Sequence, residues 1–455
     1  MQNHRLIPSV IDRLRSVIEV DRVLAAGPTG DRDRGRRLWN GAVPHQPAVI
    51  VRPRMVAEVQ KIVLIAREAE MPLSVLGGGH DWVGRSVRHG GLVIDMSSMR
   101  HVGIDTWDQV ATLQGGATAG DVIKAGAPFD LVAATGTVHA VGMVGLTLGG
   151  GYGPLNGRAG LALDNLISAD VVLADGRLVT ADAEREPDLF WALRGGGGNF
   201  GVVVSMRLRL HRIPSVLAGF ITYPLNAGGV WERLGEVLAE APDKLTVPCG
   251  VMNGEDGHPL LYLAPTWSGD PLQGERAVEP LLRLAGRGQA QTKEMSYRQV
   301  LAQNDAWAAT GRHYEIATRN VPGFTPETAA VLREAGATMT SPLTAIPMHH
   351  FHGAASRVPA EATAFGMRHD HFLIEVVAVW ESADANAVRH RAWVASVSKA
   401  LAPHSLPGGY PNLLATDAAE QIAHAYGTNA PRLLAVKHRY DPEGVFSSTP
   451  LPIAS

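Results

Sequence analysis

The chain has 455 residues, enough for two or three domains that each bury a core. Its hydrophobic content of 45% and charged content of 19% are typical of a globular protein. A formal net charge of -3 argues against a nucleic-acid or anionic membrane partner.

Three further patterns narrow the class of protein. No apolar run reaches the roughly 18 residues that a membrane helix needs, and residues 1–22 lack the apolar core of a signal peptide. The single cysteine, Cys249, excludes an internal disulfide and a cysteine-rich metal site. We therefore expect a cytoplasmic protein without a membrane partner.

The N-terminal elements predict a βαβ-like unit that ends in a glycine turn. Residues 47–53 and 72–76 are expected to be strands, and residues 55–71 between them have helical spacing of apolar residues. Three glycines, 77–79, and His80 follow the second strand. Successive N–H groups of such a turn can hold a pyrophosphate without a lysine, although such turns are more often structural. No Gly-Lys-Ser/Thr P-loop is present, which argues against a nucleoside triphosphate site.

Short strands are expected next at 91–96, 101–105 and 109–114, followed by a helix at 120–126. The segment 134–153 then holds seven glycines in twenty residues and no charge. Such a segment can lie flat against a planar, largely apolar ring, where side chains would intrude. Tight packing of two backbones is the alternative explanation.

A third glycine segment follows a predicted hairpin at 167–182 and a short helix at 187–194. Its Gly196, Gly198 and Gly201 match G-x-G-x-x-G, but the helix precedes this motif and the strand 201–210 follows it. A dinucleotide fingerprint requires the reverse order, so a Rossmann site is rejected. Asn199 is a candidate to hydrogen-bond a cofactor edge. Because all these glycine clusters lie in the first half, we expect the cofactor there.

The composition of the sequence changes after residue 212, where glycine clusters become rare. We expect a second, α+β domain at 213–404 with helices between its strands. A polar turn, an amphipathic helix and a terminal turn make up 405–455. The strands expected in the second domain are 219–225, 258–267, 344–353 and 371–380.

Several motifs in the correct order resemble the berberine-bridge-enzyme-like branch of the flavin oxidases with the vanillyl-alcohol oxidase fold. Residues 76–81 match its strand-glycine-histidine motif, and 135–142 match its T-G-x-C-P-x-V-G segment. The segments "LTLGGGYG", "LALDNL", "DLFWALRGGGGNFGVV" and the closing "YGTNAPRLLAVKHRYDPEGVF" also match. The resemblance covers about residues 37 to 447 and looks strongest to bacterial 6-hydroxynicotine oxidases with one flavin attachment.

The resemblance implies an α+β fold in two parts. The FAD-binding domain would comprise 1–212, with its PCMH-type portion at about 42–212, and the returning segment 405–455. The substrate-binding cap, an antiparallel sheet flanked by helices, would comprise 213–404.

The resemblance also implies FAD bound covalently through His80, whose family counterpart bonds from a ring nitrogen to the flavin 8α-methyl. Imidazole suits this role because it is partly neutral near pH 7. The further candidate cofactor residues are Leu76, Gly77, Gly78, Gly79, Asp81, Gly84, Arg85, Ser86, Thr135, Gly136, Val138, Gly142, Gly145, Gly149, Tyr152, Gly198, Asn199, Gly201, Val203 and Asn412.

Three positions depart from the family pattern. Val138 stands where members with two attachments have cysteine, so a second thioether link is impossible. Val144 replaces a glycine near the oxygen-reacting face, which leaves open whether dioxygen or another acceptor reoxidises the flavin. Leu413 replaces the second tyrosine of the Y-x-N-Y motif that begins at Tyr410, so a tyrosine-base mechanism cannot be carried over.

Candidate catalytic groups lie on two predicted cap strands. Strand alternation puts His350 and His352 on one face, either as base and substrate anchor or as surface or hydrogen-bonded core histidines without a catalytic role. The family resemblance favours His350 as the base. They could also be a metal pair, but no third ligand has matching spacing, so no metal site is predicted. Glu375 needs a polar pocket or a solvent edge, since burying a lone carboxylate is costly. Tyr410 and Tyr152 complete the candidates, and Trp307, Tyr314 and Trp380 are possible pocket aromatics.

The predicted function is oxidation of a C–N or C–O bond in a small, partly aromatic or polycyclic metabolite, with hydride transfer to flavin N5. Dioxygen is the expected acceptor. Alternatives are a flavin dehydrogenase with another acceptor, an oligosaccharide oxidase, or a non-catalytic flavin- or metal-binding module. The protein is expected to be a monomer or a homodimer.

Overall fold

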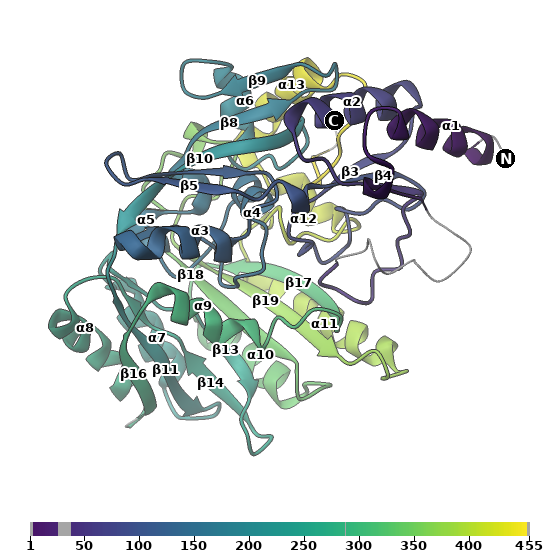
Figure 1. Cartoon of the computed structure of the whole chain (residues 1–455). Helices are drawn as coiled ribbons and strands as arrows, with labels where there is room; N and C mark the ends of the chain where they lie inside the picture. The colour runs from purple at the N-terminus through teal and green to yellow at the C-terminus, as the bar shows by residue number, and fades with distance from the viewer. Residues whose placement is uncertain (1–2, 26–37, 287, 453–455) are drawn as a thin grey trace.

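The computed structural model describes residues 3–25, 38–286 and 288–452. Three β sheets with helices around them form an α+β fold (Figure 1). Strands between residues 23 and 212 build the first two sheets, and strands between 216 and 380 build the third. No helix in the described ranges is long and apolar enough to cross a membrane.

The first sheet has four strands in the order β1-β2-β4-β3 and contains the predicted strand-helix-strand unit. Strands β2, β4 and β3 are parallel, and β1 is antiparallel to β2. Its buried Val, Ile and Leu residues pack against helix α2, whose apolar face carries Val59, Ile62 and Val63. The elements are β1 (Val23–Ala25), β2 (Val49–Val51), β3 (Leu73–Leu76), β4 (Leu92–Asp95), α1 (Asn3–Arg15) and α2 (Val56–Glu68).

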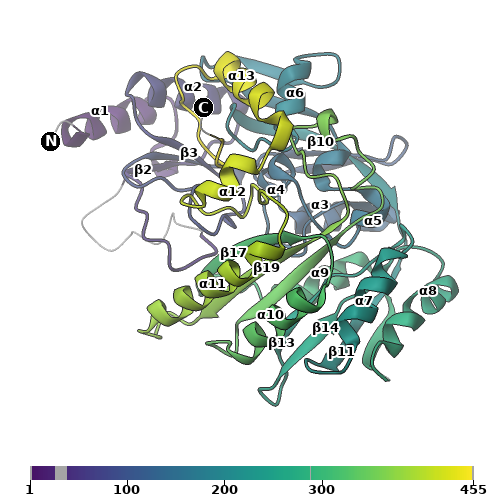
Figure 2. The same cartoon turned by 180° about the vertical axis from the view of Figure 1, so that it is seen from behind.

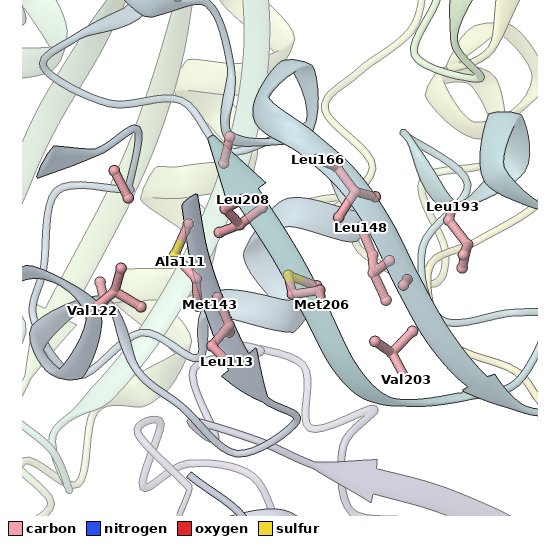
Figure 3. Close-up of a cluster of buried hydrophobic side chains, with 14 of the residues drawn as sticks. Ala111, Leu113, Val122, Met143, Leu148, Leu166, Leu193, Val203, Met206 and Leu208 are labelled. Carbon is pink, nitrogen blue, oxygen red and sulfur yellow. The ribbon is translucent and has the colours of Figure 1, made fainter. Parts of the chain in front are cut away.

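The second sheet is antiparallel and has the order β5-β6-β10-β8-β9, with β7 paired to the far end of β10. The predicted hairpin turns at Asp175-Gly176, where Gly176 has a φ of 80°. Figure 3 shows the core of this region, where Leu113 of β6, Met143 of α4 and Met206 of β10 lie together. The elements are β5 (Val102–Asp105), β6 (Val110–Gln114), α3 (Ala119–Gly126), β7 (Leu131–Ala133), α4 (Met143–Gly149), α5 (Asn156–Ala159), β8 (Leu166–Val172), β9 (Leu178–Ala181), α6 (Pro187–Leu193) and β10 (Val202–Arg212).

The third sheet has nine antiparallel strands, more than the four expected from the sequence. Helices α7, α10 and α11 cover one of its faces (Figure 2), where Trp231, Leu332 and Trp393 join the core. The sequence did not predict strand β16, because six of its seven residues are polar or small and largely exposed, so the strand lacks an alternating apolar pattern. The elements are β11 (Val216–Pro224), α7 (Val230–Ala239), β12 (Leu245–Thr246), β13 (Cys249–Asn253), β14 (Pro259–Leu263), β15 (Thr266–Trp267), α8 (Pro271–Val278), β16 (Gln289–Met295), α9 (Tyr297–Asp305), β17 (His313–Val321), α10 (Pro326–Ala337), β18 (Ala345–Phe351), β19 (His371–Trp380) and α11 (Ala387–Leu401).

Two connections join the third sheet to the other two. Helix α9 buries Tyr297, Val300 and Leu301 in the core of the second sheet, although its neighbours in sequence belong to the third. After α11 the chain returns through α12 (Ala419–His424) to α13 (Ala430–Tyr440), which lies beside α6 in both views (Figures 1 and 2).

A buried ion pair also ties the two regions together. Asp164 precedes β8, and Arg368 lies between β18 and β19. Both guanidinium Nη atoms of Arg368 donate to the Asp164 carboxylate, at 3.0 and 2.8 Å. The side chains are only 4% and 10% exposed, so neither charge can recover its hydration if the partner is lost.

We expect the substitution Asp164→Asn to lower the free energy of unfolding by about 3–5 kcal/mol, because it leaves the Arg368 guanidinium buried without a counter-charge. Denaturant titration followed by tryptophan fluorescence measures this loss. The matched control is Asp188→Asn, which breaks exposed pairs with Arg432 and Arg439 and should cost less than about 1 kcal/mol. Equal losses in the two variants would contradict the prediction.

Candidate functional site

A cavity of about 480 Å³ opens between the nine-stranded sheet and the two N-terminal sheets. Ligand pockets typically measure roughly 300–1,000 Å³. Its lining joins the segments 73–86, 136–154 and 197–203 to strands and helix α9 of the third-sheet region, and to the C-terminal residues 446–449. The glycine clusters singled out in the sequence at 77–79, 142–153 and 195–201 therefore contribute to one site.

Two of these glycine segments contact each other backbone to backbone. A Cβ atom on Gly78 would lie 2.2 Å from the nitrogen of Gly142, and one on Gly142 would lie 2.5 Å from the nitrogen of Gly78. Real Cβ atoms do not approach other atoms this closely, so both positions require glycine. At this contact, tight packing of two backbones explains the glycines.

Gly145 has a different reason to be glycine. It is exposed on α4 and lines the cavity, and a Cβ added there would meet no protein atom within 4 Å. No described residue therefore prevents a side chain at this position. A bulky ligand in the cavity would be excluded by one, which fits a flat ring system against this helix.

His80 lines the cavity at the end of the glycine turn. Its ring stacks on Trp39, with centroids 5.4 Å apart and planes 14° apart. Burial lowers the pKa of His80 to about 4, and the negative charge of Asp305 opposes this shift only in part. The imidazole is therefore neutral at pH 7 and has a lone pair available as a nucleophile.

Polar groups beside the glycine turn fit an anion. Asp81 accepts from the side-chain Nε of Arg85 at 2.8 Å, and the Nη2 of Arg85 donates to the carbonyl of Asn412 at 3.0 Å. The remaining Nη1 of Arg85 and the hydroxyl of Ser86 are buried and have no hydrogen-bond partner within the described ranges. Unpaired buried donors are costly, and a diphosphate at this end of the cavity would satisfy both.

The catalytic candidates on β18 and β19 divide between two faces, as strand alternation predicts, but the cavity meets the opposite face of β18. His349 and Glu375 line the cavity, and the Nε2 of His349 lies 2.9 Å from the Glu375 carboxylate. His350 and His352 do not line it. His350 stacks on His352 at 3.8 Å and on Phe372 at 5.1 Å, within the helix-covered side of the sheet.

The position of His350 and His352 corrects the sequence-based choice of these residues as base and substrate anchor. Burial lowers the pKa of both imidazoles, so they are neutral packing groups. The described residues contain no group of three His, Cys, Asp or Glu side chains that could hold a metal ion. A metal pair at these histidines therefore has no third ligand.

Two tyrosines line the cavity with different hydrogen-bond roles. Nδ1 of His371 lies 2.8 Å from the carbonyl oxygen of His369, so this nitrogen must carry the proton. Nε2 of His371 therefore accepts from the Tyr152 hydroxyl at 2.8 Å. The Tyr410 hydroxyl accepts from the N–H of Gly151 at 2.9 Å and from Asn412 at 3.0 Å. Burial raises the pKa of Tyr410 to about 12. Tyr410 is therefore protonated, and its O–H donates to no group in the described part of the chain, whereas the Tyr152 O–H donates to His371.

Most of the predicted cofactor residues line the cavity, and five do not. Leu76 and Thr135 are buried behind it, and Gly84 and Gly149 make room for Val43 and Asn412. Asn199 bonds to Gly196 and Thr449 and thus fixes the C-terminal segment, so it is not available to a cofactor edge. The predicted cofactor and catalytic residues that line the cavity are Gly77, Gly78, Gly79, His80, Asp81, Arg85, Ser86, Gly136, Val138, Gly142, Gly145, Tyr152, Gly198, Gly201, Val203, Glu375, Tyr410 and Asn412.

Several cavity residues had no signal in the sequence. Trp39 precedes the first motif by almost forty residues, and the contact between them forms only in the fold. Tyr262 pairs with Gly250 across β14 and β13, and its ring lies so close to Gly250 that a Cβ there would be 2.6 Å from it.

Of the suggested aromatics, Trp307 and Tyr314 line the cavity, whereas Trp380 is buried against His390.

Helix α9 is fixed to the cavity segment 135–139 at its C-terminal end. Asn304 donates to the carbonyl of Thr137 at 3.2 Å. Asp305 accepts from the backbone N–H of His139 at 3.0 Å and lies 2.7 Å from its Nδ1. These bonds hold the third-sheet region against the segment that faces the predicted flavin.

We expect Gly145→Ala to keep or slightly raise protein stability, since alanine favours a helix by about 0.5–1 kcal/mol over glycine, while the flavin content falls. The methyl group would enter the cavity without disturbing any protein atom. Thermal melting and the flavin-to-protein absorbance ratio measure the two effects. Gly235→Ala in α7 is the control, because its Cβ would also be free of clashes but lies outside the cavity. Full flavin content in Gly145→Ala would refute the placement of the ring.

Comparisons with known proteins agree with this geometry. A family model described as an FAD binding domain matches residues 47–182, and one described as berberine and berberine like matches residues 409–450. The (R)-6-hydroxynicotine oxidase of Paenarthrobacter nicotinovorans is 30% identical in an alignment 438 residues long that covers 90% of this chain and 92% of that protein. The FAD-linked oxidoreductase aurO of Gibberella zeae is 31% identical in an alignment 428 residues long that covers 90% of this chain and 81% of that protein.

Solved structures extend the similarity to the fold. The 6-hydroxy-D-nicotine oxidase from Arthrobacter nicotinovorans superimposes with a TM-score of 0.85 and 29% identity, covering 94% of this chain and 96% of that one. The xylooligosaccharide oxidase from Myceliophthora thermophila gives a TM-score of 0.84 and 26% identity, covering 98% and 100%. The chain therefore belongs to the berberine-bridge-enzyme-like family of FAD-linked oxidoreductases and has the α+β fold of that family.

Proposed function

We propose that this enzyme is an oxidase that holds FAD by one covalent bond from a ring nitrogen of His80 and oxidises a small, largely apolar metabolite with dioxygen. The observation that carries the proposal is a neutral imidazole at the end of a glycine turn, inside a cavity whose helix α4 leaves room for a flat ring. When bound, the flavin supplies the hydride acceptor, and the protein supplies binding and orientation.

The residues beside His80 would hold the rest of the cofactor. The backbone of 77–79 with Arg85 and Ser86 would bind the diphosphate. A second covalent link has no donor, because Val138 lines the cavity where a cysteine would be needed. Cys249, the one cysteine of the chain, is buried in β13 away from the cavity lining, and burial raises the pKa of its thiol.

The cap-side lining indicates the chemistry of the substrate. Among the described residues between 216 and 380 the lining is mostly apolar and aromatic and includes no lysine or arginine, with Glu375 as its charged group. Such a lining favours an apolar ring compound that is neutral or cationic over a carboxylic acid. An amine or alcohol carbon of a small aromatic or polycyclic metabolite fits better than an oligosaccharide, which needs many hydrogen-bond donors.

Glu375 is the proposed base. One carboxylate oxygen accepts from His349, and no other protein group within the described ranges bonds to the second oxygen, although the side chain lines the cavity. His349 orients this carboxylate, so the free oxygen can take a proton from a substrate hydroxyl or ammonium group. The O–H of Tyr410 can donate to the substrate and orient the reacting carbon.

The electron acceptor depends on access to the flavin near α4. Val144 lines the cavity beside Gly145, at the position where relatives carry glycine. A dehydrogenase with another acceptor is the second candidate function, since the valine side chain narrows the space there. Anaerobic reduction by substrate followed by admission of air separates the two: rapid return of the oxidised spectrum supports the oxidase, and a persistent reduced spectrum supports the dehydrogenase.

Covalent attachment makes a direct prediction. The wild-type protein should stay yellow after acid precipitation, whereas His80→Ala should release all its FAD into the supernatant, because the nucleophilic nitrogen is gone. His89→Ala, at an exposed histidine outside the cavity lining, is the control and should keep its colour. Acid-stable flavin on the His80→Ala chain would sink the assignment.

Removing the proposed base should slow flavin reduction. We expect Glu375→Gln to lower the anaerobic reduction rate by about a hundredfold or more while flavin binding is unchanged, since general base catalysis contributes at least this much. Stopped-flow absorbance with a substrate found by flavin bleaching measures the rate. The control Glu381→Gln, just beyond the end of β19 in an exposed pair with Arg312, should reduce at the wild-type rate. An unchanged rate in Glu375→Gln would assign the proton transfer to another group.

A further inference from the structure

We propose that Trp39 is the positioning residue that sets the plane of the His80 imidazole for its attachment to the flavin. This inference rests on the proposed covalent link. Trp39 lines the same cavity as His80 and stacks on it nearly in parallel, with planes 14° apart.

Hydrogen bonds do not fix the His80 ring. No described residue bonds to either of its ring nitrogens, unlike those of His349 and His371, whose rings are oriented by Glu375 and by the carbonyl of His369. An imidazole turns about two side-chain bonds, so its plane needs another restraint to aim a lone pair at one carbon atom. Trp39 is the aromatic ring that the structure places against it.

Trp39 is itself held on several sides. Its backbone N–H donates to the carbonyl of Gly79 at 2.9 Å, so it is fixed to the residue before His80. Its indole Nε1 donates to the carbonyl of Ala308 at 2.9 Å, and its own carbonyl accepts from Gly311 at 2.9 Å. The indole plane therefore cannot turn freely. The His80 imidazole, which stacks on it, is held nearly parallel to that plane.

The Trp39 ring also stacks on Tyr314 of β17, with ring centroids 3.7 Å apart and planes 26° apart. The Tyr314 hydroxyl donates to the carbonyl of Ala309 at 2.6 Å, which holds the tyrosine in place. Asn40 adds a bridge by donating to the carbonyls of Trp82 and Tyr314, at 2.7 and 2.9 Å. The row Tyr314–Trp39–His80 thus connects the third sheet to the attachment site, and the third-sheet region must be in place before the imidazole is aimed.

The bond to be formed defines what this positioning has to achieve. The imidazole N–H and one C–H of the flavin 8α-methyl group are lost, and an N–C bond forms between the two atoms. Dioxygen takes the two hydrogens and the two electrons and leaves as hydrogen peroxide. Aiming the neutral nitrogen at that carbon is the contribution we assign to Trp39, which takes no proton or electron in the step.

The test measures the rate of attachment rather than turnover. Full-length protein from flavin-starved cells is mixed with FAD, and acid-stable flavin fluorescence is followed with time. We expect Trp39→Leu to bind FAD but to attach it about two- to tenfold more slowly than wild type, the range that an aromatic pair contributes. Trp39→Phe keeps a ring against the imidazole and should attach FAD within about twofold of wild type.

Trp393→Leu is the matched control, since it truncates a buried tryptophan whose Nε1 also has an acceptor, Thr338, far from the cavity lining. It should lower the melting temperature without changing the attachment rate. If Trp39→Leu is too unstable to purify, Trp39→Met occupies much of the space without a ring plane and should show the same slow attachment.

Two outcomes would overturn the inference and leave the covalent link intact: attachment by Trp39→Leu or Trp39→Met at the wild-type rate, or a Trp39→Phe variant as slow as Trp39→Leu. The second outcome would make the bond to Ala308, not the stacked ring, the determining contact. A wild-type protein that releases all its flavin in acid would instead overturn the covalent link itself, and this inference with it.

Discussion

The backbone contact between Gly78 and Gly142 is the constraint on which the rest of the site depends. It brings the turn after β3 of the first sheet against the start of α4 beside the second sheet, at a separation that any side chain would prevent. This contact fixes the start of α4, on which Gly145 faces open space, beside the turn that carries His80 into the lining of the same cavity. One contact without side chains therefore determines where a flat cofactor can lie.

The nine-stranded sheet and its helix α9 complete the cavity through apolar clusters shared with the N-terminal region and through polar contacts made outside the strands. The Asp305–His139 pair fixes α9 to the segment that includes Val138, and Arg368–Asp164 fixes the connection before β19. Under the proposed single attachment these bonds gain importance, since the position of the flavin ring would then depend on how firmly the surrounding segments are held.

The sequence predicted the parts of the site that depend on local pattern. The glycine clusters chosen from the sequence line one cavity, and the predicted order of a helix before Gly196 and a strand after Gly201 is the order that the structure shows. Alternation along β18 correctly put His349 and His350 on opposite faces. It could not say which face the helices cover, because both faces carry apolar and polar residues, and that choice is made by α7, α10 and α11 packing from elsewhere in the chain.

Residues that act through distant contacts had no local signature. Asn199 was a reasonable cofactor ligand from its place among glycines, yet the C-terminal segment uses both ends of its amide. Trp39 shows the converse: it lies outside every motif, but the fold puts it between Tyr314 and His80. A histidine with no hydrogen bond to its ring can still be oriented if a rigid ring lies against it. The chemistry at His80 then depends on a residue that only the assembled sheets bring into place.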